Sequence, residues 1–118
     1  MYADEAAVEL LIGHQRWLDR DDFVDGFVET GEGWSDGRPM AWVDWPAAVA
    51  ALDTGRLVCS GSEAGVLRVA ASIAAGGRVD LGDVLAGLDG RNLVLVAAAV
   101  LHAGGHRQAA LWGEGVRR

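Results

Sequence analysis

At 118 residues, the chain has room for one domain with its own hydrophobic core and none for a second. Its hydrophobic content is 51%, but its net charge is −7, so a surface that grips nucleic-acid phosphates is not expected. Charge is uneven, because residues 1–53 carry twelve acids and three arginines, a net of −9, and residues 54–118 carry a net of +2.

Cysteine content and hydropathy indicate where the protein resides. The first residues are acidic where a secretory signal would be basic, and the longest uninterrupted apolar run, 93–101, is too short to cross a membrane. A single cysteine, Cys59, cannot form an internal disulfide, which fits a reducing compartment. We therefore expect a cytoplasmic protein with no membrane partner.

Two amphipathic helices are predicted at the start of the chain. Residues 4–19 place apolar side chains at the three-and-four spacing of one helix face, and Asp4 can cap the first turn. A short acidic connection follows, and then Phe23 and Phe27 lie one turn apart in a second helix. Because the connection is short, we expect the two helices to pack as a helical hairpin.

Residues 30–43 interrupt the helical pattern. Several glycines and a proline indicate a loop, and its apolar end, residues 40–43, is too short to form an element of its own, so an extended course across the helices is expected. A third helix is predicted to start near Asp44, with Pro46 in its first turn, and to stop at Gly55.

Capping signals mark the helices of the second half. Ser60 and Glu63 have the spacing of a capping box, in which each side chain binds the backbone N–H of the other residue. Asp80 can cap a short helix after a pair of glycines. These signals predict a fourth and a fifth helix.

The last predicted helix, residues 91–103, is the most apolar part of the chain. No side chain in residues 93–101 is polar, so no face is left for water, and such a helix belongs in the centre of a bundle. A buried β-strand over residues 93–96 is the alternative. The sequence thus predicts an all-α fold for residues 1–118: a compact irregular bundle of five or six helices around this central apolar helix.

Residues 80–101 have the outline of a helix-turn-helix, with a short helix, a glycine turn and a longer helix. A recognition helix needs polar or basic side chains in its first turns to contact base edges. Those positions hold Asn92 and then only aliphatic residues. We therefore interpret the segment as a buried helical hairpin and expect no nucleic-acid partner.

The three histidines are the candidate metal ligands. His102 and His106 have the spacing of two ligands on one helix face, and His14 could supply a third. However, two glycines lie between His102 and His106, and the glutamate of the hydrolytic zinc motif is missing. We expect His14 to be a core histidine and the other two to lie at a helix end, with no metal or other cofactor.

A group of tryptophans is the strongest pointer to a site. Trp34, Trp42 and Trp45 fall in or beside the one long predicted loop, and tryptophan suits ligand pockets and interaction hot spots. Asp36 and Arg38 could add polar specificity. These five residues form the predicted binding site. In the alternative interpretation, Trp42 and Trp45 close the open end of the bundle.

Three functions remain open. The preferred one is a non-enzymatic protein-interaction or regulatory module that uses its acidic N-terminal half and the tryptophan loop to bind a protein partner. A homodimer is a separate possibility, because so apolar a chain can leave a helix face uncovered. The second is a helical protein that binds a small molecule in an apolar, tryptophan-lined cleft. The third is a small enzyme with His14 or His102 beside an aspartate, although no nucleophile–base pair is visible in the sequence.

Overall fold

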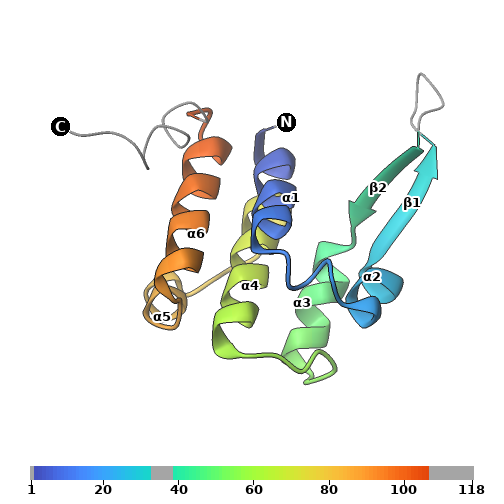
Figure 1. Cartoon of the computed structure of the whole chain (residues 1–118), viewed down its shortest axis with the longest axis horizontal. Helices are drawn as coiled ribbons and strands as arrows, with labels where there is room; N and C mark the ends of the chain where they lie inside the picture. Colours follow the sequence, from blue (N-terminus) through green and yellow to red (C-terminus); the bar gives the residue numbers. More distant parts are fainter. Residues whose placement is uncertain (1, 33–38, 107–118) are drawn as a thin grey trace.

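The computed structural model describes residues 2–32 and 39–106, which form a mostly helical fold with one small antiparallel sheet (Figure 1). No helix in this part of the chain is long and apolar enough to cross a membrane. In chain order the elements are α1 (Tyr2–His14), α2 (Asp21–Phe27), β1 (Val28–Glu32), β2 (Pro39–Val43), α3 (Trp45–Asp53), α4 (Gly61–Ala75), α5 (Leu81–Ala86) and α6 (Gly90–Ala103).

The central element is α4, which packs against α1, α3, α5 and α6 (Figure 1). Its predicted capping box is confirmed: Ser60 Oγ accepts from the Glu63 N–H at 3.1 Å, and Glu63 Oε1 accepts from the Ser60 N–H at 2.9 Å. Gly76 ends the helix with a φ of 79°, a conformation that glycine adopts without strain. Between these ends, Val66 and Ala70 are fully buried.

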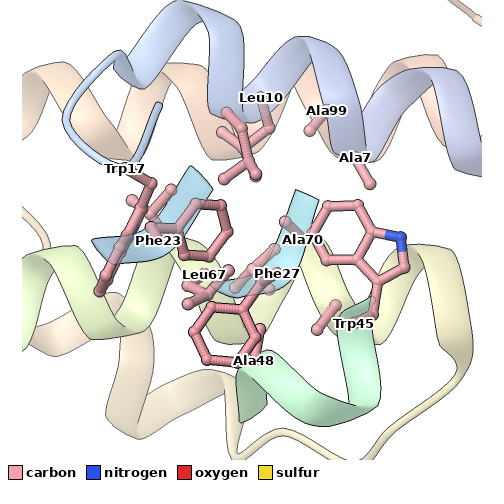
Figure 2. Packing of buried hydrophobic residues seen from close by; sticks show 14 of the residues in the cluster. Ala7, Leu10, Trp17, Phe23, Phe27, Trp45, Ala48, Leu67, Ala70 and Ala99 are labelled. Carbon is pink, nitrogen blue, oxygen red and sulfur yellow. The ribbon is translucent and has the colours of Figure 1, made fainter. Parts of the chain in front are cut away.

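Aromatic rings fill the core between α1, α2 and α4 (Figure 2). Trp17 is fully buried, and its indole N–H donates to the backbone carbonyl of Glu63 at 2.9 Å. The Trp17 ring lies 5.3 Å from the Phe23 ring, which in turn lies 5.7 Å from the Phe27 ring, the one-turn stack that the sequence predicts. Trp17 therefore connects the turn after α1 to both α2 and α4.

The first helix ends earlier than predicted. Gln15 has a φ of 73°, which stops α1 at His14, and the predicted helical residues Trp17 and Leu18 lie in the following turn. The chain changes direction there, so α2 packs mainly against β1 and α3 and not against α1. The predicted helical hairpin is therefore wrong.

The predicted loop at residues 30–43 contains most of a β-hairpin. Strands β1 and β2 pair antiparallel, with Val28 opposite Val43. A Cβ at Gly31 would lie 3.0 Å from the indole ring of Trp42, so the glycine makes room for this ring. The all-α prediction is corrected here: the expected extended course is present, but it is hydrogen-bonded to a second strand.

The apolar helix α6 lies at the edge of the fold and not at its centre, so the predicted central position of residues 91–103 is wrong. It packs mainly on α1 and α4, through a face that includes the buried Val96 and Ala99. Its other face is open, with Val94 50% and Val100 52% exposed. Two neighbouring helices cannot cover a helix that is apolar all round.

Close packing joins α6 to α1, which runs antiparallel to it (Figure 1). A Cβ at Gly13 would lie 3.0 Å from the side chain of Leu95, so the glycine lets the two backbones approach. Arg91 extends from the start of α6 and donates through Nη2 to the carbonyl of Gly13 at 2.7 Å. The alternative of a strand over residues 93–96 is excluded by this helix.

Replacing Trp17 by alanine is expected to lower the free energy of unfolding by about 3–5 kcal/mol, because a fully buried aromatic ring leaves a cavity. Trp42→Ala is the matched control: its ring is 44% exposed, and the expected loss is below about 1 kcal/mol. Urea unfolding followed by far-UV circular dichroism measures both. Equal losses would contradict the placement of Trp17 in the core.

Candidate functional site

The structure describes two of the five residues in the predicted tryptophan site. Trp34, Asp36 and Arg38 lie outside the described residues. Trp42 is exposed on β2, whereas Trp45 starts α3 and is buried in the core beside Ala48 and Ala7 (Figure 2). The two described tryptophans therefore sit in different surroundings, one on the surface and one in the core.

The three histidines lie in different places. His102 is buried between α6 and α1, where its Nε2 is 3.6 Å from Glu5 Oε1 and its Nδ1 is 3.8 Å from Glu9 Oε1. His106 is exposed beyond the end of α6. His14 is the last residue of α1, whereas His102 lies near the first turns of that helix. Within residues 2–32 and 39–106, no three His, Cys, Asp or Glu side chains are grouped to hold a metal ion.

A polar pocket lies where the C-terminal end of α1 meets the N-terminal ends of α4 and α6, at the lower end of these helices in Figure 1. Its volume is about 300 Å³, at the lower end of the range for small-molecule sites. That volume corresponds to about ten water molecules at about 30 Å³ each. The pocket is lined by His14, Arg16, Ser60, Ser62, Glu63, Asp89, Arg91 and Asn92.

Two capped helix ends face the pocket. Ser60 caps α4, and Asp89 caps α6 by accepting the Asn92 N–H on Oδ1 at 2.8 Å. Both helices direct the positive ends of their dipoles toward this region. The turn at Gln15 brings His14 and Arg16 to the same place. The local signals that end α1 and start α4 and α6 therefore also build the pocket.

Asn92 lines this pocket and carries a buried side-chain acceptor, and the residue is only 6% exposed. Its Nδ2 donates to Ser62 Oγ at 2.8 Å and approaches Asp89 Oδ2 at 3.4 Å, and these two acceptors fix the orientation of the amide. The other amide atom, Oδ1, has no hydrogen-bond partner within residues 2–32 and 39–106. A buried acceptor without a partner costs about 1–3 kcal/mol, so a donor at this oxygen would stabilise the folded protein.

His14 supplies a second unpaired atom. The residue is 2% exposed, and its Nδ1 has no hydrogen-bond partner in the part of the chain that the structure describes. Burial lowers the pKa of His14 below its usual value, so the ring is neutral at pH 7 and the free nitrogen donates or accepts according to its tautomer. Among the described residues no carboxylate is hydrogen-bonded to His14, so the orienting partner of a catalytic histidine is not in place.

Opposite charges are balanced around the pocket. Arg16 and Arg91 contribute two positive charges, and Glu63 and Asp89 contribute two negative ones. The backbone N–H of Ser60 donates to Glu63 and lowers the pKa of its carboxyl, which therefore stays ionised at neutral pH. The pocket can thus face a positive and a negative group at once.

Sequence reasoning found one residue of this pocket and missed the others as a site. His14 stood out because it falls on an apolar helix face, whereas Ser60, Glu63 and Asp89 were explained by helix capping or left as a linker. Asn92 carried one weak signal, as the single polar side chain at the head of an apolar run.

The chain matches no protein-family model, no curated protein and no solved structure.

The buried, neutral state of His14 predicts lower stability at mildly acidic pH. The folded pKa lies below the unfolded value near 6.5, so below about pH 6.5 the unfolded chain binds a proton that the folded protein resists. The free energy of unfolding should therefore fall as the pH drops from about 7 to about 5, as measured by urea unfolding at each pH.

The variant His14→Gln should flatten this dependence, because it removes the group whose pKa differs between the two states. His106→Gln is the matched control, since His106 is exposed, and its profile should follow that of the unmodified protein. If His14→Gln kept the full dependence, burial of a neutral His14 would be wrong.

Proposed function

We propose that the protein binds a small zwitterion of the free amino-acid class in the polar pocket. The carrying observation is the pair of buried, unpaired atoms, Asn92 Oδ1 and His14 Nδ1, in two residues that line the same pocket. Buried polar groups are nearly always hydrogen-bonded, so two exceptions in one pocket mark a place that is completed by a ligand.

The unpaired oxygen of Asn92 requires the ligand to carry a hydrogen-bond donor. An amide oxygen only accepts hydrogen bonds, so the ligand has to bring a donor to it. A bare anion such as sulfate has no donor and would place its lone pairs against this oxygen. An ammonium group meets the requirement, and the carboxylates of Glu63 and Asp89 in the same pocket favour its positive charge.

Arg16 and Arg91 favour a ligand that also carries a carboxylate. Guanidinium groups such as those of Arg16 and Arg91 bind carboxylates with two parallel hydrogen bonds, and the helix N-termini of α4 and α6 favour a negative group nearby. A molecule with an ammonium and a carboxylate on neighbouring carbons satisfies both sets. The volume of about 300 Å³ admits a free amino acid and excludes a dinucleotide.

This proposal keeps the small-molecule class that the sequence left open, but it places the site away from the tryptophans. The pocket is polar, in contrast to the apolar cleft expected around Trp42 and Trp45. The interaction module that the sequence favours would use Trp34, Asp36 and Arg38, outside the described residues, together with the exposed Trp42, and it stays a prediction.

Binding is tested by titrating the ¹⁵N-labelled full chain with L-serine and L-glutamine and following its amide signals. The expected result is saturable shifts at His14, Ser62 and Asn92. Acetate and ethylammonium, which carry one half of the zwitterion each, should bind at least about tenfold more weakly, because each leaves one set of charges unpaired. Equal binding of acetate would contradict the zwitterion, and no saturable shift with either amino acid would overturn the proposal.

Asn92→Leu separates a binding role from a structural one. It removes the costly unpaired oxygen together with the hydrogen bonds from Nδ2 to Ser62 and Asp89, and because these effects oppose each other the free energy of unfolding should stay within about 1 kcal/mol of the unmodified protein. Amino-acid affinity should fall at least about tenfold, because the ligand's donor loses its acceptor. A large loss of stability with unchanged affinity would assign Asn92 to the fold alone.

Two arginine variants provide the matched pair for charge. Arg16→Gln removes a guanidinium from the pocket, whereas Arg56→Gln removes one from the exposed stretch after α3, outside the pocket. Both change the net charge equally. Only Arg16→Gln should weaken amino-acid binding, by about tenfold or more as measured by calorimetry. Equal weakening by both variants would mean that general charge, and not the pocket, controls affinity.

A further inference from the structure

The exposed face of α6 contains no polar side chain. Opposite the side that packs on α1 and α4, the helix exposes Leu93 by 43%, Val94 by 50%, Val100 by 52% and Leu101 by 39%, with the exposed Ala97 between the two pairs. These five residues recur at the three-and-four spacing of a single helix face. We call them the α6 face.

Apolar side chains are also exposed on α1, which packs against α6, and on α5, which precedes α6 in the chain. Patches of this kind on a soluble domain mark surfaces that bind another protein. A stable interface buries about 800 Å² on each partner, more than one short helix provides, so these neighbours are needed to complete it. They are Val8 and Ile12 on α1 and Leu81 and Leu85 on α5.

The order of residues on the α6 face identifies what covers it. Outward from Ala97, the face has valine and then leucine in both directions: Val94 and Leu93 toward the N-terminus, and Val100 and Leu101 toward the C-terminus. A twofold axis through Ala97 therefore matches the face to itself, with each leucine meeting a leucine and each valine a valine. This self-matching is the property that an isologous dimer interface requires.

The small side chain of Ala97 suits the centre of such a pair. Two helices that cross at alanines approach closely, and the larger residues on either side then pack around the crossing point. In an antiparallel pair, Leu93 lies against Leu101 of the second copy, and Val94 lies against Val100 of the second copy. No charged side chain interrupts the α6 face.

Charges at the two ends of α6 favour the antiparallel direction. Arg91 lies at the N-terminal end, and Glu5 and Glu9 lie beside His102 near the C-terminal end. Antiparallel pairing brings Arg91 of each copy to the level of these two acids in the other copy, whereas parallel pairing places Arg91 against Arg91. Asp89, at the same end as Arg91, is engaged as the helix cap.

We infer that the protein forms a homodimer in which the α6 face packs antiparallel against the α6 face of a second copy, with the twofold axis at Ala97. This inference does not depend on ligand binding, although Arg91 lies at the border of both the pocket and the proposed interface. The packed side of α6 carries Asn92, and the α6 face lies on the opposite side of the helix.

Oligomeric state is the first test, on the full chain by light scattering coupled to size exclusion at about 100 µM, well above a micromolar dissociation constant. The unmodified protein should elute at twice its mass of 12.4 kDa. Ala97→Arg should elute as a monomer with an unchanged circular dichroism spectrum. Ala50→Arg, the same change at an exposed position of α3, should remain dimeric. A monomeric unmodified protein, or an Ala97→Arg variant as dimeric as Ala50→Arg, would overturn the inference.

Cysteine cross-linking tests the axis itself, in a Cys59→Ser background that removes the single native thiol. A disulfide needs Cα atoms about 4.4–6.8 Å apart, which the twofold axis provides at position 97 and not at position 93. Ala97→Cys should therefore give a covalent dimer on a non-reducing gel, and Leu93→Cys should not. Cross-linking at both positions would show a parallel pair, and cross-linking at neither would show another partner surface.

Discussion

The contact between Trp17 and the first turn of α4 is the interaction on which the rest of the structure depends. The indole N–H donates to the carbonyl of Glu63, a residue 46 positions further along the chain, while the ring packs against Phe23 of α2. One side chain thereby fixes the turn after α1, the start of α4 and the position of α2. His14 lies three residues before Trp17, and the side chain of Glu63 reaches back to Ser60. The same contact that closes the core therefore holds two sides of the polar pocket in place.

Two ionisable groups of the pocket have opposite charge states at neutral pH, one neutral and one charged, and the physical causes differ. Burial lowers the pKa of His14 and keeps the ring neutral, whereas the donated N–H of Ser60 lowers the pKa of Glu63 and keeps that carboxyl charged. The buried His14 Nδ1 and Asn92 Oδ1 have no hydrogen-bond partner among the described residues, and each such atom lowers the stability of the fold. A fold selected for stability alone would replace these groups. Their presence at three converging helix ends is consistent with a polar ligand that pairs with them.

Local signals in the sequence predict the helix starts well, because capping acts within one turn. Ser60 with Glu63, Asp44 and Asp80 cap α4, α3 and α5. The cap predicted at Asp4 is wrong, because α1 already starts at Tyr2. Tertiary contacts decide the rest. The early end of α1 at a non-glycine residue, Gln15, has no local signal, and β1 becomes a strand only through its pairing with β2. The pocket could not be assembled from the sequence for the same reason, since its residues come from three helix ends that only the folded chain brings together.

The position of α6 shows that hydrophobicity alone does not place a helix at the centre of a fold. How closely other elements can approach a helix matters as much. Small residues on α4 let its neighbours pack closely, and at Gly65 an added Cβ would lie 3.2 Å from the side chain of Val84 on α5. Leucine and valine on the α6 face hold other elements further away, and within residues 2–32 and 39–106 no further helix covers them. In the inferred homodimer, α6 of a second copy covers this face. Since Asn92 lies on the packed side of α6, the proposed pairing leaves the ligand pocket open, and one helix can serve both.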